Sequence, residues 1–253
     1  MKKNICLLIF ILMGVFITLP LISLIVMGSR GEDWIFVLKS QRFYEGLVNT
    51  ILIGSLTVII DIIIGTPISS IVARENFRMK KFIEMLIVLP LIIPGFIMVM
   101  GIQYNFIKFG LIDGILGVTL IHSVVTLPYY IISMRVAYST LSRDYNRLGK
   151  IMGASDFQIF RKITLPIIFP GFLGGISMVL IVSFNQYLTT LIIGGGEVIT
   201  LPILMFPYLS GGDIKVGGVY SILYILINLF LVVFLEKSLE KVYYKKGLKN
   251  DKN

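Results

Sequence analysis

The sequence predicts an all-α membrane protein with six transmembrane helices and both termini in the cytoplasm. Hydrophobic residues make up 56% of the 253 residues and charged residues only 15%, and the mean hydropathy is +0.91. A water-soluble domain needs far fewer apolar residues. Apolar runs of about 20 residues recur along the chain, and each is long enough to cross a hydrocarbon core of roughly 30 Å. Basic residues gather in alternate connections between these runs.

The apolar runs define the expected spans. They do not alternate polar and apolar residues as barrel strands do, so we expect helices, which satisfy their own backbone in lipid. The first run follows Lys2 and Lys3, as in a signal peptide, but it is too long and no A-x-A site follows, so we interpret it as a retained anchor. The expected spans are Ile5 to Met27, Leu47 to Ala73, Phe82 to Gln103, Ile115 to Tyr138, Ile167 to Ile193 and Val216 to Leu235.

Lys and Arg predict the orientation, because they favour the cytoplasmic side of a membrane. Most of the 23 basic residues lie at the N-terminus, at 74–81, at 135–162 and in the tail from 237. The net charge of +9 therefore lies at membrane edges, where it suits anionic lipid rather than nucleic acid. We expect an anchor and first outer loop at 1–46, a transmembrane domain at 47–236 and a basic cytoplasmic tail at 237–253.

Several spans carry local signals. Pro90 and Pro94 should kink the third span, which is typical of cavity-lining helices in transporters but also occurs in simple bundles. Gly171 and Gly175 let another helix approach the fifth span closely, and internal packing is the simpler interpretation. The aromatic residues of the first outer loop indicate an interfacial belt; they are Trp34, Phe36, Phe43 and Tyr44.

Asp61 and His122 are ionisable residues that lie well inside the apolar runs. Asp61 is the only carboxylate well inside a span, and His122 is the only histidine. Such groups mark either a functional place or a polar contact between helices, and the sequence leaves both open. No nucleotide, zinc or acyl-enzyme motif is present, Cys6 is alone, and no metal-ligand set is visible.

The fifth span ends in an unusually polar patch. Asn185, Gln186 and Tyr187 follow Ser183, and Thr189 and Thr190 come next. These amides and hydroxyls could hydrogen-bond a passing solute, or they could satisfy one another between helices.

A charged segment at 141–166 separates the fourth and fifth spans. Its apolar residues recur at helical spacing, Gly153 can end a first helix, and Ser155 with Gln158 can form the capping box of a second. The result is a helix, turn, helix unit at the cytoplasmic face. It either rests on the membrane surface or docks in a groove of a cytoplasmic partner.

This segment resembles a known family. Gly153 followed by Ile163-Thr164-Leu165-Pro166 matches the G-x9-I-x-L-P half of the EAA loop of ABC importer permeases. Asn49-Thr50, Leu127-Pro128 and Thr200-Leu201-Pro202 support the match elsewhere in the chain. The most similar members are permeases of the polyamine, thiamine, ferric iron and aminoethylphosphonate group.

The resemblance implies a type I ABC importer permease of the methionine-importer-like fold in the inner cell membrane. It implies a second permease subunit, identical or related, a dimer of cytoplasmic ATPases and an external solute-binding protein. The chain itself would bind no cofactor and catalyse nothing, because the ATPase binds ATP and Mg. The implied ATPase-coupling residues are Arg147, Gly149, Gly153, Ala154, Ser155, Phe160, Ile163, Leu165 and Pro166, and the candidate pathway residues are Asp61, His122, Asn185, Gln186 and Tyr187.

Two departures from the family pattern matter. Arg147-Leu148-Gly149 replaces E-A-A, so a positive charge stands where the family carries an acid. Polyamine permeases often read F-D-E-F where this chain has Phe184-Asn185-Gln186-Tyr187, which removes two negative charges. We expect transport of a small polar solute, either a polyamine or a thiamine-like molecule. The alternative is an autonomous ion-coupled carrier or channel that uses Asp61 and His122.

Overall fold

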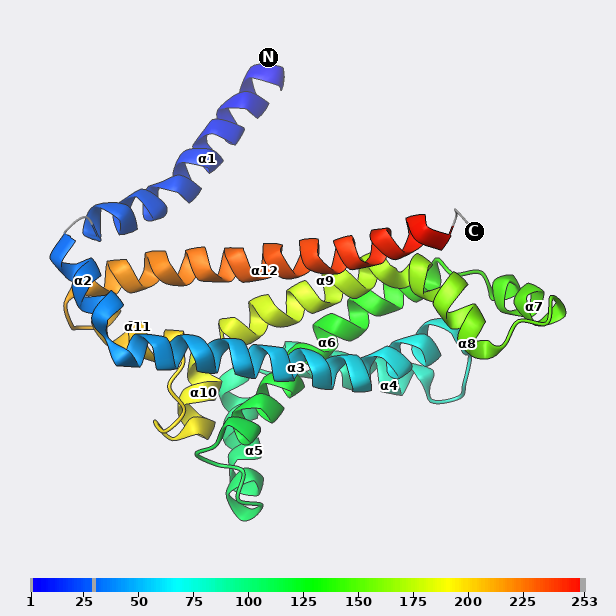
Figure 1. Cartoon of the computed structure of the whole chain (residues 1–253). Helices are drawn as coiled ribbons and strands as arrows, with labels where there is room; N and C mark the ends of the chain where they lie inside the picture. Colours follow the sequence, from blue (N-terminus) through cyan, green and yellow to red (C-terminus); the bar gives the residue numbers. More distant parts are fainter. Residues whose placement is uncertain (1, 29–30, 251–253) are drawn as a thin grey trace. The chain divides into compact units, whose positions relative to one another are not determined.

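The chain is helical throughout the part that the structure describes. The computed structural model describes residues 2–28 and 31–250, and no strand occurs among them. Figure 1 shows the helices along the chain. They are α1 Lys2–Met27, α2 Gly31–Lys39, α3 Gln41–Arg74, α4 Lys80–Ile92, α5 Gly95–Lys108, α6 Ile115–Ser139, α7 Arg143–Ile151, α8 Asp156–Ile159, the π-helix η1 Phe160–Thr164, α9 Leu165–Phe184, α10 Tyr187–Gly194, α11 Leu201–Leu209 and α12 Ile214–Asn250.

Among the described residues, four to six segments are long and apolar enough to cross a membrane. Four are single helical stretches: Gln41–Arg74, Ile115–Ser139, Asp156–Phe184 and Ile214–Lys237. Two more are bent pairs, formed by Leu12–Val26 with Gly31–Lys39 at 82° and by Lys80–Ile92 with Gly95–Lys108 at 105°. The predicted helical membrane fold is confirmed, while the orientation of the termini stays a prediction.

Two expected spans are interrupted. The kink predicted in the third span is a full bend, because Ile93 has an extended backbone and α5 starts afresh after Pro94. The fifth span, expected to run from Ile167 to Ile193, ends its first helix at Phe184 and resumes at Tyr187. Both breaks place backbone groups inside a membrane segment, where they need protein partners.

The contacts divide the chain into two units. The smaller comprises Met1–Val48 and Ile199–Leu229, and the larger comprises Asn49–Val198 and Phe230–Asn253. The smaller unit packs around Val37, Phe43, Val219 and Tyr220. Phe43 is 4% exposed, and the centroid of its ring lies 6.2 Å from that of the Tyr220 ring. Because Phe43 is buried inside the unit, the prediction that it belongs to an interfacial belt was wrong.

The larger unit is built on α6 and α9, which run side by side (Figure 1). One apolar cluster lies between them and includes Tyr130, Met134, Ile168 and Val179. A second cluster gathers residues of α3, α5, α6 and α10, together with Val198: Ile53, Val99, Val118, Ile121, Ile193 and Val198. Gly171 and Gly175 face α6, where Cβ atoms would meet Ala137 and Tyr130, so this glycine pair serves internal packing.

Two polar contacts fasten further helices of the larger unit. Arg135 of α6 forms an ion pair of 2.9 Å with Glu84 of α4. Ser177 of α9 donates a hydrogen bond of 2.6 Å to Glu236 of α12. The larger unit therefore carries both the segment at 141–166 and the buried polar residues on one connected framework.

Candidate functional site

The segment between α6 and α9 forms the helix, turn, helix unit that the sequence predicts. The Ser142 hydroxyl accepts a hydrogen bond of 3.2 Å from the Asp144 backbone and caps α7. Gly153 then takes φ +78°, a left-handed conformation that favours glycine and ends the helix. Gly149 faces Ile159, whose side chain would lie 2.7 Å from a Cβ at position 149, so α8 packs closely on α7.

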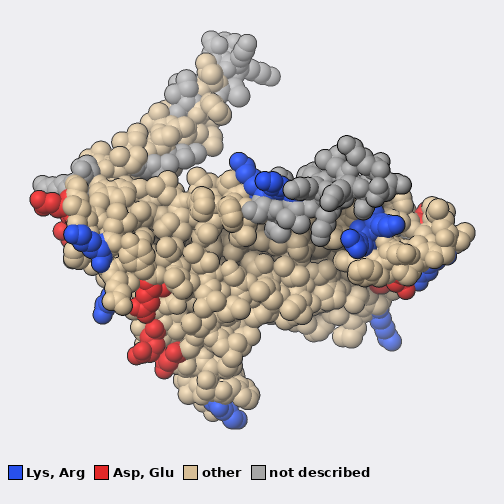
Figure 2. Space-filling model, in the orientation of Figure 1, with Lys and Arg blue, Asp and Glu red and all other residues tan. Residues whose placement is uncertain are grey.

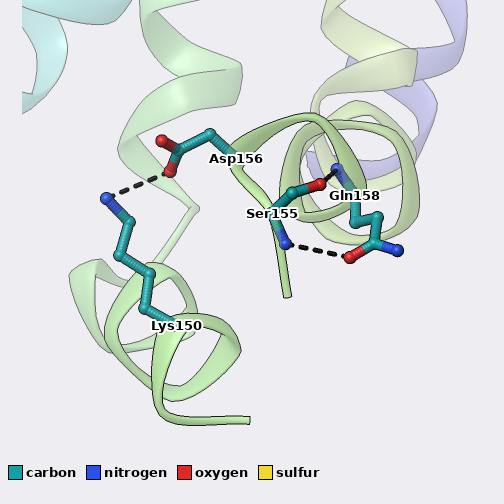
Figure 3. A network of polar contacts seen from close by, with 4 residues as sticks. All are labelled: Lys150, Ser155, Asp156 and Gln158. Atoms are coloured by element: carbon teal, nitrogen blue, oxygen red, sulfur yellow. Dashed lines mark hydrogen bonds and ion pairs between the residues drawn. The ribbon is translucent and has the colours of Figure 1, made fainter. Parts of the chain in front are cut away.

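The turn between α7 and α8 is fixed by polar contacts (Figure 3). The Gln158 backbone donates 3.3 Å to the Ser155 hydroxyl, and the Ser155 backbone donates 2.9 Å to Gln158 Oε1, which confirms the predicted capping box. Lys150 Nζ lies 3.0 Å from Asp156 Oδ1 and links the two helices. The turn therefore has one defined geometry.

The predicted apolar stripe of this segment is mostly exposed in the chain alone. Leu141 and Ile159 are 4% exposed. Four apolar side chains are more than half exposed: Leu148, Ile151, Met152 and Phe157. We call these four the loop patch. Arg147, in place of the family acid, is exposed beside it, and basic side chains gather around this end of the larger unit (Figure 2).

The implied coupling residues after the turn lead directly into α9. Ala154 and Ser155 follow Gly153, and Phe160, Ile163 and Leu165 continue the same helical path. The five residues from Phe160 to Thr164 are π-helical, and the Leu165 backbone donates to the Phe160 carbonyl. Pro166 is the second residue of α9 and follows η1 without a break, so its missing N–H leaves the helical ladder one donor short at this junction.

Asp61 binds two hydroxyls of α6. Ser123 donates to Asp61 Oδ1, and Thr126 donates to Oδ2 over 2.6 Å and also contacts the His122 carbonyl. Asp61 is 0% exposed. The carboxylate thus joins α3 to α6 as a polar helix contact, one of the two interpretations that the sequence left open.

His122 points to other partners. Its Nδ1 lies 2.9 Å from Ser183 Oγ of α9, and its Nε2 lies 2.9 Å from Thr190 Oγ1 of α10. Among the described side chains, no hydrogen bond joins His122 to Asp61. The structure therefore brings α3 and α6 together without pairing these two residues with each other.

The polar patch at the end of α9 is partly satisfied internally. Thr189 donates 2.8 Å to Gln186 Oε1, and Thr190 donates 2.5 Å to the Gln186 carbonyl. The Asn185 amide donates 2.7 Å to the Ile181 carbonyl, yet Asn185 is exposed, while Gln186 and Tyr187 are half-buried. The sequence did not predict that Asp61 would bind Ser123 and Thr126 or that His122 would bind Ser183. The only signal for these contacts was the presence of hydroxyl side chains inside apolar runs.

Comparison with known proteins identifies the family. A profile described as "Binding-protein-dependent transport system inner membrane component" matches residues 65–241, more than half of the chain. The Mycobacterium bovis molybdenum transport system permease protein ModB is 25% identical over 76% of this chain and 78% of its own length. The Salmonella typhimurium putative 2-aminoethylphosphonate transport system permease protein PhnV is 25% identical over 93% and 94%.

The fold is also that of a solved transporter. A bacterial ABC transporter that imports the acidic polysaccharide alginate matches with a TM-score of 0.71, at 16% identity over 93% of this chain and 96% of that chain. The chain therefore belongs to the inner-membrane components of binding-protein-dependent transport systems: it is a multi-pass ABC importer permease without a catalytic site of its own, and a partner ATPase binds the nucleotide.

Proposed function

We propose that this permease provides part of the pathway for a small polar solute, and that residues 141–166 receive the cytoplasmic ATPase. The observation that supports docking of the ATPase on residues 141–166 is the exposure of the loop patch. Its apolar side chains are exposed, with Met152 at 85% and Ile151 at 81%, beside charged residues at one end of the larger unit. Exposed apolar patches with a polar rim are typical of protein contacts.

The geometry of the turn favours a protein groove over a membrane surface as the site of docking. A helix that only rests on lipid needs an apolar face but no fixed turn. Here the capping box, the left-handed Gly153 and the Lys150 ion pair hold the loop patch in one shape. Because the segment continues through η1 into α9, movement of the loop would move the helix that packs on α6.

Charge substitutions in the loop patch test this docking. Met152→Asp and Phe157→Asp should lower co-purification of the ATPase and ATP hydrolysis by the assembled transporter, because a buried carboxylate at an interface is unfavourable. Phe109→Asp is the matched control, since Phe109 is 71% exposed in the same unit and lies outside the candidate membrane spans. If all three variants retained the ATPase equally, residues 141–166 would not form its docking surface.

The remaining partners follow from the family and its solved relative. A second solved structure holds the alginate transporter in complex with an alginate pentasaccharide-bound periplasmic protein. By this likeness we expect an external solute-binding protein to deliver the solute to this permease, and a second permease subunit, identical or related, to complete the pathway.

For the solute we place oxyanions and phosphonates first. The relatives above are named for molybdenum and 2-aminoethylphosphonate, and Pyrococcus abyssi WtpB, a molybdate/tungstate permease protein, is 24% identical over 87% of this chain. The residues Asn185 and Gln186 offer amide donors without a carboxylate, which suits an anion. A polyamine or a thiamine-like molecule, favoured by the sequence resemblance, is the second candidate.

Calorimetry on the cognate solute-binding protein separates these solutes. Molybdate, tungstate, 2-aminoethylphosphonate, spermidine and thiamine would each be titrated into the purified protein. Micromolar or tighter binding of an anion supports the first assignment. Binding of spermidine or thiamine alone would replace it with the second.

The candidate pathway residues Asn185, Gln186 and Tyr187 lie at the break between α9 and α10. We propose that Asn185 and Gln186 contact the solute, while the buried Asp61 and His122 act through other residues. The double variant Asn185→Leu with Gln186→Leu should reduce uptake at equal membrane abundance. Unchanged uptake would assign the two amides to packing.

A further inference from the structure

The break between α9 and α10 has an unusual set of supports. The α-helix ends at Phe184, and Gln186 leaves the helical conformation with ψ 80° before Tyr187 starts α10. Gln186 is the N-cap of α10, so its backbone carbonyl begins the hydrogen-bond ladder of that helix, and it also accepts the Thr190 hydroxyl over 2.5 Å. Side chains therefore add to the backbone hydrogen bonds that shape the break.

His122 lies across this break. Ser183 precedes it in α9, Thr190 follows it in α10, and each hydroxyl lies 2.9 Å from one ring nitrogen of His122. His122 is 2% exposed, Ser183 is 3% exposed and Thr190 is 0% exposed. One side chain of α6 thus binds both sides of the interruption.

The direction of these hydrogen bonds follows from counting protons. A hydroxyl has one proton, and Thr190 donates its proton to the Gln186 carbonyl over 2.5 Å. Thr190 Oγ1 must therefore accept from His122 Nε2–H. A neutral imidazole has only one N–H, so in that form Nδ1 accepts from Ser183. The chain of donated protons then runs from Ser183 through His122 and Thr190 to the Gln186 carbonyl.

The same network fixes the side chain of Gln186. Thr189 donates 2.8 Å to Gln186 Oε1, so the carbonyl end of the amide is held from α10. The two Nε2 protons are then the groups that Gln186 can offer to a solute. Their direction depends on the backbone of the break, which Thr190 and His122 hold.

We infer that His122 is a positioning residue of the transport pathway: it sets the geometry of the α9–α10 break and thereby the direction in which Gln186 presents its donors. This inference rests on the proposed pathway role of Asn185 and Gln186. It assigns His122 a role different from proton or ion transfer, because both ring nitrogens are bound to hydroxyls and Asp61 is bound by Ser123 and Thr126.

A labelling experiment tests the inference without a known solute. In the full transporter, Cys6→Ser removes the only cysteine of this chain, Asn185→Cys places a thiol at the break, and the label on this chain alone is measured. The probe is 2-sulfonatoethyl methanethiosulfonate, applied to proteoliposomes. His122→Leu and Thr190→Val should each change the labelling rate by about fivefold, the ratio expected from one lost hydrogen bond.

Two further variants make the result specific. His122→Gln keeps an amide donor toward Thr190 and should restore the rate, and the double variant His122→Leu with Thr190→Val should change it no more than either single variant. Ser123→Ala is the matched control, because it removes a buried hydroxyl from the neighbouring position of α6 that binds Asp61 instead. Ser123→Ala should leave the rate unchanged.

The outcomes separate the inference from the pathway proposal. Equal rates in all variants, or an equal change with Ser123→Ala, would overturn the positioning role. Thr190→Val keeps the test valid if His122→Leu does not fold, since it preserves side-chain shape. Separately, if complete labelling of the Asn185→Cys variant, with His122 intact, left uptake unchanged, the pathway proposal would fail whatever His122 does to the rate.

Discussion

At the scale of single residues, Tyr130 shows how three helices of the larger unit come together. Its ring is 0% exposed, and its hydroxyl lies 2.8 Å from the Thr66 hydroxyl of α3. A Cβ atom on Gly65 would lie 2.5 Å from one side of the ring, and a Cβ on Gly175 would lie 2.9 Å from the other side. The ring therefore fills the space that two glycines leave on α3 and α9.

Gly65→Ala and Gly175→Ala should each destabilise the larger unit by about 1–3 kcal/mol, because the added methyl group overlaps the Tyr130 ring. The melting temperature of the purified permease in detergent measures the effect. Gly101→Ala on α5 is the control, since no atom lies within 4 Å of a Cβ there. Equal melting temperatures for the Gly65, Gly175 and Gly101 variants would show that α3 and α9 accommodate the added methyl groups without a loss of stability.

Gly153 gives a second test at this scale. No atom lies within 4 Å of a Cβ at this position, so a substitution acts through the backbone at φ +78° rather than through a clash. Gly153→Val should lower ATP hydrolysis stimulated by the loaded binding protein by roughly tenfold, because left-handed backbone costs a β-branched residue about 1–2 kcal/mol.

The matched variant is Gly153→Asn, because asparagine adopts the left-handed conformation more readily. It should keep most of the stimulated hydrolysis although its side chain is comparable in size to that of the valine variant. If both variants lost activity equally, bulk at the turn and not its backbone conformation would control coupling.

Local signals explain which features of this site the sequence predicted. The capping box at Ser155, the turn at Gly153 and the interruption at Pro94 depend on residues close in sequence, and each occurs in the structure. The partners of Asp61 and His122 lie about 60 residues or more away and depend on how helices pack. The residues at the break after Phe184 include no proline. The sequence therefore predicted a polar patch there but no interruption of the helix.

At the scale of elements, η1 joins the loop to α9 with hydrogen bonds that span five residues instead of the four of an α-helix. The Leu165 backbone donates to the carbonyl five residues earlier, that of Phe160. Arg161 and Lys162 are exposed, whereas Thr164 is 6% exposed. The side of η1 that carries Arg161 and Lys162 therefore faces away from the core, and η1 connects the loop to α9.

Deletion of Lys162 should convert η1 to an α-helical turn and leave α9 in register. We expect the shortened permease to insert and to melt within a few degrees of the parent, while hydrolysis stimulated by the binding protein falls because the loop patch is rotated. Deletion of Met178, an exposed residue of regular α9, should instead rotate everything beyond it by ~100° and prevent folding. If the two deletion variants had similar melting temperatures, η1 would not tolerate the loss of a residue better than regular α9 does.

At the scale of the whole molecule, the buried polar side chains of Asp61 and His122 connect helices to one another. ATP is hydrolysed by a partner subunit. Each Asp61 oxygen accepts a hydroxyl, and each His122 nitrogen is bound to another. An ion-coupled carrier needs these groups to exchange protons or ions during each cycle. An ABC importer needs them only to hold α3, α6, α9 and α10 together while the loop moves.

Asp61→Asn separates these two modes of transport. The amide can still accept from one hydroxyl and donate to the other, so we expect a loss of about 1 kcal/mol in stability and uptake that remains driven by ATP. Uptake would be measured in proteoliposomes that contain the permeases, the ATPase and the binding protein, with ATP removed or with ion gradients collapsed. ATP removal should abolish uptake in the parent and in the variant alike. If uptake continued without ATP, and if collapsing the ion gradients or introducing Asp61→Asn then abolished it, this permease would also work as an ion-coupled carrier.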